Sequence, residues 1–280
     1  MTVGIERTSL VLRLIASHQR SGIGLTKLAK TLSLEVPTAH RVLKELEIAR
    51  MVQRDADKRY RLGSLMLELG VTAMHSSSLI DSFRPVLAGL AARTGDTVFL
   101  IIRSSDESVC LDRAEGSFPI KTLVMEKGGR RPLGVGGASM HLLSQLGQEE
   151  AFEIIDGNAH RYAEFHDVNV EALKLGYLQA QKDGYGINRN RQTSGVTAVG
   201  VALPQGVAGG TQLGIGVACI TPRMTESHLD FVVEEIQRAI DTVARDAETF
   251  STFLAKFSAP VGKVKAVSYT HLTLPTIYSV

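Results

Sequence analysis

The chain of 280 residues carries 31 Lys and Arg against 29 Asp and Glu, with 44% hydrophobic and 21% charged residues. These proportions exclude a disordered or fibrous protein, and the length allows one or two domains with a sizeable core. The near-neutral total hides an asymmetry, because residues 1–75 hold 12 Lys/Arg against 7 Asp/Glu (+5) and the remainder holds 19 against 22 (−3). A basic N-terminal segment favours contact with a polyanion.

The chain shows no sign of export or membrane insertion. No segment approaches the ~20 apolar residues that a spanning helix needs, and Arg7 and Arg13 interrupt the stretch that could serve as a signal sequence. Cys110 and Cys219 lie in apolar runs without a CxxC partner or metal-ligand spacing, so we expect buried, reduced thiols. These features predict a cytoplasmic protein that uses no metal and no cofactor.

Three helices are expected at the start of the chain. Residues 5–18 carry an apolar stripe at helical spacing, and the polar segment 19–24 is typical of a turn. Thr26 is well placed to cap a second, short helix. A tight turn at 33–36 leads to a third helix with Pro37 in its first turn, where the missing N–H is not needed.

The third helix has two contrasting faces. Its apolar stripe consists of Ala39, Val42, Leu43 and Leu46, and its opposite face of Pro37, Thr38, His40, Arg41, Lys44 and Glu45. A guanidinium such as that of Arg41 can contact guanine or a phosphate, and the hydroxyl of Thr38 can meet a phosphate or a base edge. A short helix, a tight turn and a helix with an outward basic face form a helix-turn-helix arrangement.

A basic hairpin is expected next. Residues 51–54 and 59–63 alternate on either side of the polar turn 55–58, as the strands of a hairpin do, and suit a wing lying along the DNA backbone. The residues predicted to contact double-stranded DNA are Thr26, Thr38, His40, Arg41, Lys44, Arg54, Lys58, Arg59 and Arg61. The alternative is that these side chains only solvate the surface, because helix-turn-helix patterns also occur in proteins that bind no DNA.

Four segments of this region share the pattern of one known family: 25–29 (LTKLA), 34–46 (LEVPTAHRVLKEL), 60–63 (YRLG) and 67–70 (LELG). They resemble the IclR family of bacterial transcription regulators. Thr38, His40, Arg41 and Leu43 match the Thr-x-His-Arg-x-Leu signature of its recognition helix. The resemblance implies that Thr38 and Arg41 face DNA, with His40 nearby. The chain departs from the pattern at Val36, a poor N-cap where the family usually has a basic residue.

A helix over 64–78 is expected to link a winged helix-turn-helix domain (1–63) to a larger domain (79–257). In the resembled family this helix also packs against its counterpart in a dimer. Met66, Leu69 and Met74 are therefore either interface residues or part of the intrachain core. The larger domain is expected to contain strands near 97–102, 108–113, 120–124, 196–203 and 212–220, and helices near 80–93, 138–146, 149–155, 168–183 and 225–256. An antiparallel sheet flanked by helices is an α+β domain.

The resemblance continues more weakly through this second domain, at GDTVFLII (95–102), GGRRPLGVGG (128–137) and DGYGIN (183–188). It covers almost all of residues 5–255 and implies a GAF-like effector-binding domain.

The glycine-rich segment 132–138 precedes a predicted helix. Clustered glycines there expose backbone N–H groups and the positive end of the helix dipole, which suits a carboxylate; a tight, closely packed turn is the alternative. The resemblance places the effector pocket at this segment and two strands. The residues predicted to bind the effector are Leu133, Gly134, Val135, Gly136, Gly137, Ala138, Ala198, Gly200, Gly216 and Ala218. The last four are small where the family often has polar side chains, so we expect a roomier, more apolar pocket for an aromatic or longer-chain organic acid.

No catalytic motif supports the alternative that the second domain is an enzyme. Ser139 lacks a GxSxG elbow, His160 and His166 lack HExxH spacing, and no P-loop or complete GxGxxG follows a strand. A second alternative is a DNA-binding protein whose C-terminal domain only oligomerises. The favoured function is a ligand-responsive transcription regulator that acts as a homodimer or homotetramer on paired half-sites and binds a small-molecule effector but no membrane.

The last residues, 267–280 (VSYTHLTLPTIYSV), carry no Asp, Glu, Lys or Arg and do not continue the amphipathic pattern before them. They resemble the translated read-through of a sequencing adapter, so we expect a non-native tail. A native tail or edge strand is the alternative.

Overall fold

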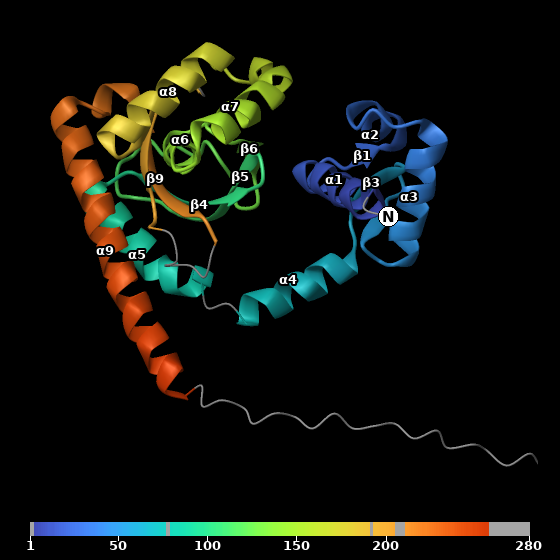
Figure 1. Ribbon diagram of the computed structural model, residues 1–280, viewed down its shortest axis with the longest axis horizontal. Helices are drawn as coiled ribbons and strands as arrows, with labels where there is room; N and C mark the ends of the chain where they lie inside the picture. Colours follow the sequence, from blue (N-terminus) through green and yellow to red (C-terminus); the bar gives the residue numbers. More distant parts are fainter. Residues whose placement is uncertain (1–2, 77–78, 191–192, 205–210, 258–280) are drawn as a thin grey trace, which may run out of the picture.

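The chain forms an N-terminal winged helix and a larger C-terminal α+β part, which helix α4 (Ser64–Ser76) joins (Figure 1). The structure is a computed structural model, and it describes residues 3–76, 79–190, 193–204 and 211–257. The expected tail at 267–280 lies outside these residues. Within them, no helix is both long enough and apolar enough to cross a membrane.

The N-terminal part confirms the predicted winged helix-turn-helix. Its elements are α1 (Val3–Ser17), β1 (Ile23–Gly24), α2 (Leu25–Thr31), α3 (Val36–Ile48), β2 (Val52–Arg54) and β3 (Arg59–Leu62). The three strands form an antiparallel sheet in the order β1-β3-β2. Val11, Leu28 and Leu43, one from each helix, are completely buried together. The apolar stripes of the sequence therefore meet in one core, as helical spacing predicts.

The starts of α2 and α3 differ from the predicted capping. The N-cap of α2 is Gly24, whose extended backbone (φ −78°, ψ 152°) leads from β1 straight into the helix. Thr26 lies inside that helix and is exposed, so its prediction as a cap is wrong. Glu35 occupies the N-cap position of α3 without a side-chain hydrogen bond, and Pro37 lies in the first turn as expected.

The C-terminal part is built around six antiparallel strands in the order β6-β5-β4-β9-β8-β7. The strands are β4 (Thr97–Ser104), β5 (Glu107–Ala114), β6 (Arg130–Pro132), β7 (Gly186–Arg189), β8 (Val196–Ala202) and β9 (Leu213–Ile220). The helices are α5 (Leu79–Thr94), α6 (Gly137–Ser144), α7 (Gln148–Gly157), α8 (Val170–Asp183) and α9 (Glu226–Phe257), with short 3-10 turns η1 (Ala159–Glu164) and η2 (Thr221–Arg223). This arrangement confirms the α+β class.

Each face of this sheet has its own core. Phe99 and Ile101 of β4 pack with α6, α7 and α8 on one face, whereas Val98 and Leu100 pack with α5 and α9 on the other. Both sets are buried because successive side chains of a strand point to opposite faces. Figure 1 shows the two helical layers on either side of the sheet.

The strand expected at 120–124 is absent, and neither β6 nor β7 is predicted from the sequence. The segment between β5 and β6 passes the end of the sheet instead of joining it. The Thr122 N–H donates to the Thr97 hydroxyl (3.2 Å), and the Lys121 amine donates to the carbonyl of Phe118 (2.7 Å). Ile120 and Leu123, whose apolar character favoured a strand, remain exposed.

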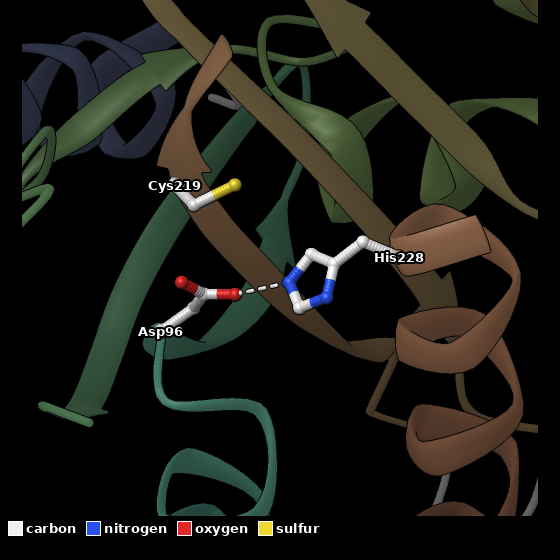
Figure 2. A group of neighbouring side chains, drawn as sticks. All are labelled: Asp96, Cys219 and His228. Atoms are coloured by element: carbon white, nitrogen blue, oxygen red, sulfur yellow. Dashed lines mark hydrogen bonds and ion pairs between the residues drawn. The ribbon is translucent and has the colours of Figure 1, made fainter. Parts of the chain in front are cut away.

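A buried ionic network joins α9 to the start of β4 (Figure 2). The Asp96 carboxylate accepts hydrogen bonds from Arg223 Nε (2.6 Å) and lies 2.7 Å from His228 Nε2. The Arg223 guanidinium also donates to the Thr94 carbonyl (2.8 Å). Cys219 completes the group, and burial raises the pKa of its thiol to about 12.

Although Asp96, Cys219 and His228 offer ligand atoms that metals prefer, we interpret this cluster as structural. Both carboxylate oxygens of Asp96 already have partners. A dication would also have to lie beside the Arg223 guanidinium and displace a proton from a thiol that burial keeps neutral.

His141 makes the C-terminal part sensitive to acid. Its Nδ1 accepts the Ala202 N–H (2.9 Å), its Nε2 lies 3.1 Å from the Gln145 amide, and burial lowers its pKa to about 4 from 6.5. Because the folded pKa is depressed, the neutral ring stabilises the fold fully above pH 6.5, and this stabilisation declines as the pH falls towards 4. We expect about 2 kcal/mol of unfolding free energy to be lost from this residue between pH 7 and pH 5.

Urea unfolding at the two pH values measures this loss. The variant His141→Gln, which cannot be protonated, should be less stable at pH 7 but should show a pH dependence smaller by that amount. An identical pH dependence in both proteins would contradict the assignment.

Candidate functional site

Helix α3 presents a free basic face. Its apolar residues Ala39, Leu43 and Leu46 are buried against the winged helix core, which turns Arg41 and Lys44 outward. Within the described part of the chain, neither of these two cations forms an ion pair. His40 is exposed and Thr38 is half-buried at the start of the same face. The geometry is therefore suited to insertion into a major groove.

The cations of the wing have different surroundings. Lys58 lies exposed in the hairpin turn, with a left-handed backbone (φ 61°), and the Arg54 guanidinium lies 5.5 Å from the centre of the Tyr60 ring. The Arg61 guanidinium is instead directed towards the body of the domain. It donates to the Asp55 carboxylate (3.1 Å) and to the Gln19 carbonyl (2.6 Å).

Arg59 and Arg61 therefore help to hold the wing in place, whereas Arg54 and Lys58 remain available. Arg59 donates to the Ser21 carbonyl (3.3 Å), and its own N–H lowers the pKa of Asp55 by donating to that carboxylate. The sequence alone does not predict which cations of the hairpin hold the wing and which remain available, because this depends on how the hairpin packs against residues 19–22.

A narrow cavity, partly open to solvent, lies between the sheet and the start of α6. Its free volume is about 40 Å³, so it is smaller than the roomy pocket that the small residues of the sequence predict. Its lining residues are Phe99, Ile101, Ser108, Val124, Met125, Arg131, Val135, Gly136, Gly137, Ala138, Ser139, Ala198, Val199, Gly216, Val217 and Ala218.

The structure brings seven of the ten predicted effector-binding residues to this cavity: Val135, Gly136, Gly137, Ala138, Ala198, Gly216 and Ala218. The other three lie elsewhere. Leu133 is completely buried in the core, and the nearest group to an added Cβ on Gly134 is the Leu143 side chain. Gly200 lies on β8 directly under Ala138, so the backbone of α6 covers it.

Sequence reasoning missed three polar residues of the cavity: Ser108, Arg131, and Ser139, whose hydroxyl accepts the Gly134 N–H (2.9 Å). The pair Arg130-Arg131 forms most of β6, and the alternation of a strand sends the two guanidiniums to opposite faces. Arg130 pairs with the Glu107 carboxylate, whereas Arg131 lines the cavity. A strand of three residues carries too short a pattern to be recognised in advance.

The winged helix contacts the C-terminal part beside this cavity. Arg13 of α1 donates to the Ser104 hydroxyl (2.6 Å), which also accepts a hydrogen bond from Arg130 (3.1 Å). Arg20 forms an ion pair with Glu126, in the segment 124–131 that also supplies three lining residues of the cavity. One segment therefore touches both the cavity and the DNA-binding part.

A winged helix with a free basic recognition face, joined to a separate domain with an internal cavity, defines a transcription regulator with a DNA-binding and an effector domain. Comparison with known families agrees. Residues 4–56 match the IclR helix-turn-helix domain, and residues 71–245 match the family described as bacterial transcriptional regulator IclR C-terminal. The chain belongs to the IclR family.

Several known proteins and solved structures are similar to this chain over most of their length. The chain is 26% identical over 233 residues to the "Probable transcriptional regulator SauR" of Cupriavidus necator. The aligned region covers 82% of this chain and 92% of that protein. It is 25% identical over 240 residues to the HTH-type transcriptional regulator XynR of Escherichia coli, covering 84% and 93%. A crystal structure of an IclR transcriptional regulator from Silicibacter sp. TM1040 has the same fold, with a TM-score of 0.74, 19% identity and coverage of 87% and 96%.

Proposed function

We propose that this regulator binds operator DNA through α3 and the tip of its wing, and that a compact organic acid in the C-terminal cavity controls this binding. The observation that carries the proposal is the cavity itself, whose walls are mostly apolar but include one partly buried cation, Arg131. Apolar walls with few polar groups are typical of small-molecule sites. With about 40 Å³ of free space the cavity must widen to hold an acid of the size of benzoate, since a cavity of ~150 Å³ is what binds benzene.

The segment 124–131 supplies a route between the two sites. A ligand that displaces Val124, Met125 or Arg131 would also move Glu126, whose partner is Arg20 of the winged helix. A ligand can shift DNA binding only if the two arrangements of this segment bind it with different affinity. Control of DNA binding by this route therefore requires that the Arg20–Glu126 ion pair is present in one arrangement and broken in the other.

We further propose that the chain acts as a homo-oligomer through α4. Leu67, Leu69 and Val71 of this helix are 70%, 52% and 44% exposed, although apolar side chains at such density are usually covered by a partner. Met66 is half-buried, and the side chain of Met74 lies outside the described residues. Paired recognition helices require paired half-sites in the operator. Sedimentation at micromolar concentration tests the assembly, since a monomer would exclude it.

Replacing Arg41 tests the DNA-binding half of the proposal. We expect Arg41→Ala to weaken binding to the gene's own upstream DNA by roughly 1–3 kcal/mol, because one base or phosphate contact is lost. Gel-shift titration at fixed salt measures the change, and Arg189→Ala, which removes an exposed arginine of β7, serves as the control. Equal affinities for both variants would remove Arg41 from the interface.

The effector half is tested on the same DNA. An effector should raise the melting temperature of the protein by mass action and change the gel-shift midpoint. A C-terminal domain that serves only assembly would show neither response to any small acid.

A further inference from the structure

Arg131 is a partly buried cation without an anionic partner. Its guanidinium donates to the Val124 carbonyl and lies 5.9 Å from the centre of the Phe165 ring. Among the residues that the structure describes, no carboxylate lies within ion-pair distance of it, whereas its neighbour Arg130 pairs with Glu107. Burial lowers the pKa of Arg131 to about 10, so the group stays charged at neutral pH at a cost in solvation.

Ser108 places a second polar group beside this cation. Ser108 on β5 is the direct cross-strand partner of Arg131 on β6, so the two side chains project from the same face of the sheet. Ser108 is 1% exposed and lines the cavity, and its hydroxyl makes no hydrogen bond within the described part of the chain. A hydroxyl with no partner next to a guanidinium with no counter-ion forms a site for an anion.

The start of α6 lies across the same cavity. Its N-cap, Gly136, has a left-handed backbone (φ 107°) and no side-chain cap, and Gly137 and Ala138 follow as the first helical residues. The backbone N–H groups at the first turn of a helix have no partner within the helix, and the dipole there favours negative charge. The guanidinium, the Ser108 hydroxyl and the start of α6 therefore all favour an anion.

We propose that Arg131 and Ser108 bind the carboxylate of the effector, opposite the first turn of α6, while the rest of the acid packs against Phe99 and Met125. This assignment rests on the proposed function, because it names the charge that the C-terminal cavity recognises. A carboxylate matches the single guanidinium in charge and in its two parallel acceptor oxygens. The remaining lining side chains are almost all apolar, so a second charge on the ligand would have no partner in this cavity.

The first experiment needs no ligand. A cation retained for binding destabilises the empty protein, so Arg131→Met should raise the melting temperature of the ligand-free protein by about 2 °C or more. The matched control is Arg189→Met, an exposed arginine of β7 outside the cavity, which should leave the melting temperature nearly unchanged. A lower melting temperature for Arg131→Met would show that the guanidinium serves the fold, and would overturn the proposal.

The second experiment measures binding with defined probes: benzoate, phenylacetate, isovalerate, their uncharged amides, and inorganic phosphate. At least one carboxylate should raise the melting temperature of the wild type while its amide does not. Its affinity, from the concentration dependence, should fall about 10- to 100-fold in Arg131→Met, and less in Ser108→Ala and Arg131→Lys. The control variant Arg189→Met should bind as the wild type does.

Three outcomes would overturn the assignment: stabilisation by no carboxylate of the set, equal stabilisation of wild type and Arg131→Met, or stabilisation by inorganic phosphate instead. The proposed function fails separately. If an uncharged amide stabilises the protein and releases it from DNA, the regulator still senses a ligand in this domain, and only the role of Arg131 is wrong.

Discussion

Replacing Arg223 with Met is expected to lower the free energy of unfolding by about 3–5 kcal/mol, because it leaves one oxygen of the buried Asp96 carboxylate without its cation, while His228 stays beside the other. The Asp96 side chain is 1% exposed and the Arg223 side chain 29%, so water can replace the guanidinium only in part. The same substitution removes the donor to the Thr94 carbonyl and the contact of Arg223 with the Phe118 ring, 4.5 Å away. Urea unfolding at pH 7 measures the loss.

A double-mutant cycle separates the unpaired charge from the lost packing. Adding Asp96→Asn to Arg223→Met removes the buried charge, so the double variant should be more stable than Arg223→Met alone. Arg50→Met is the matched control, because the ion pair of Arg50 with Glu68 is long (3.9 Å) and both side chains are mostly exposed. It should cost less than about 1 kcal/mol. If the stability lost by the double variant equals the sum of the losses of the two single variants, the two charges do not interact.

Periodic apolar patterns predicted most elements of this fold. The stripe of Ala39, Leu43 and Leu46 lies in the core as expected, and the helices and long strands begin and end within a few residues of the predicted bounds. These patterns succeed because burial of one face is what selects the helix or strand. The pattern of Ile120 and Leu123 failed because no strand lies beside it to accept its backbone hydrogen bonds.

The cavity was only partly predictable. The glycine-rich segment before α6 indicated its position, but the polar pair that gives it charge depends on register. Ser108 and Arg131 are 23 positions apart and meet only because β5 and β6 pair antiparallel in one particular alignment. A shift by one residue would exchange Arg131 for Arg130 at the cavity. No local feature of the sequence determines that alignment.

The small residues of β8 and β9 predict space for a ligand, but one of them, Gly200, is small because α6 packs against it. Ala198 and Gly200 share a face of β8, yet Ala198 lines the cavity and Gly200 lies under α6. A missing side chain leaves room for a ligand only where nothing else fills the space. In this fold the backbone of α6 fills it at Gly200.

Gly200→Ala should therefore destabilise the protein by about 3 kcal/mol or more, at the upper end of what overpacking costs. A Cβ on Gly200 would lie 2.5 Å from the backbone nitrogen of Ala138 and 2.6 Å from its Cα, closer than van der Waals contact allows. Relief requires α6 to move away from β8, and α6 forms one wall of the cavity. We expect affinity for the effector to fall together with stability, as thermal shift and urea unfolding would measure.

Two further variants identify the backbone as the cause. Gly157→Ala, at the end of α7 where an added Cβ meets nothing within 4 Å, should be neutral or stabilising by up to about 1 kcal/mol. Adding Ala138→Gly to Gly200→Ala removes only the side chain on the opposite side of the contact. Because the two closest atoms belong to the backbone of residue 138, that second change should restore little stability. Full recovery would show that the methyl group of Ala138, rather than the main chain of α6, requires glycine at position 200.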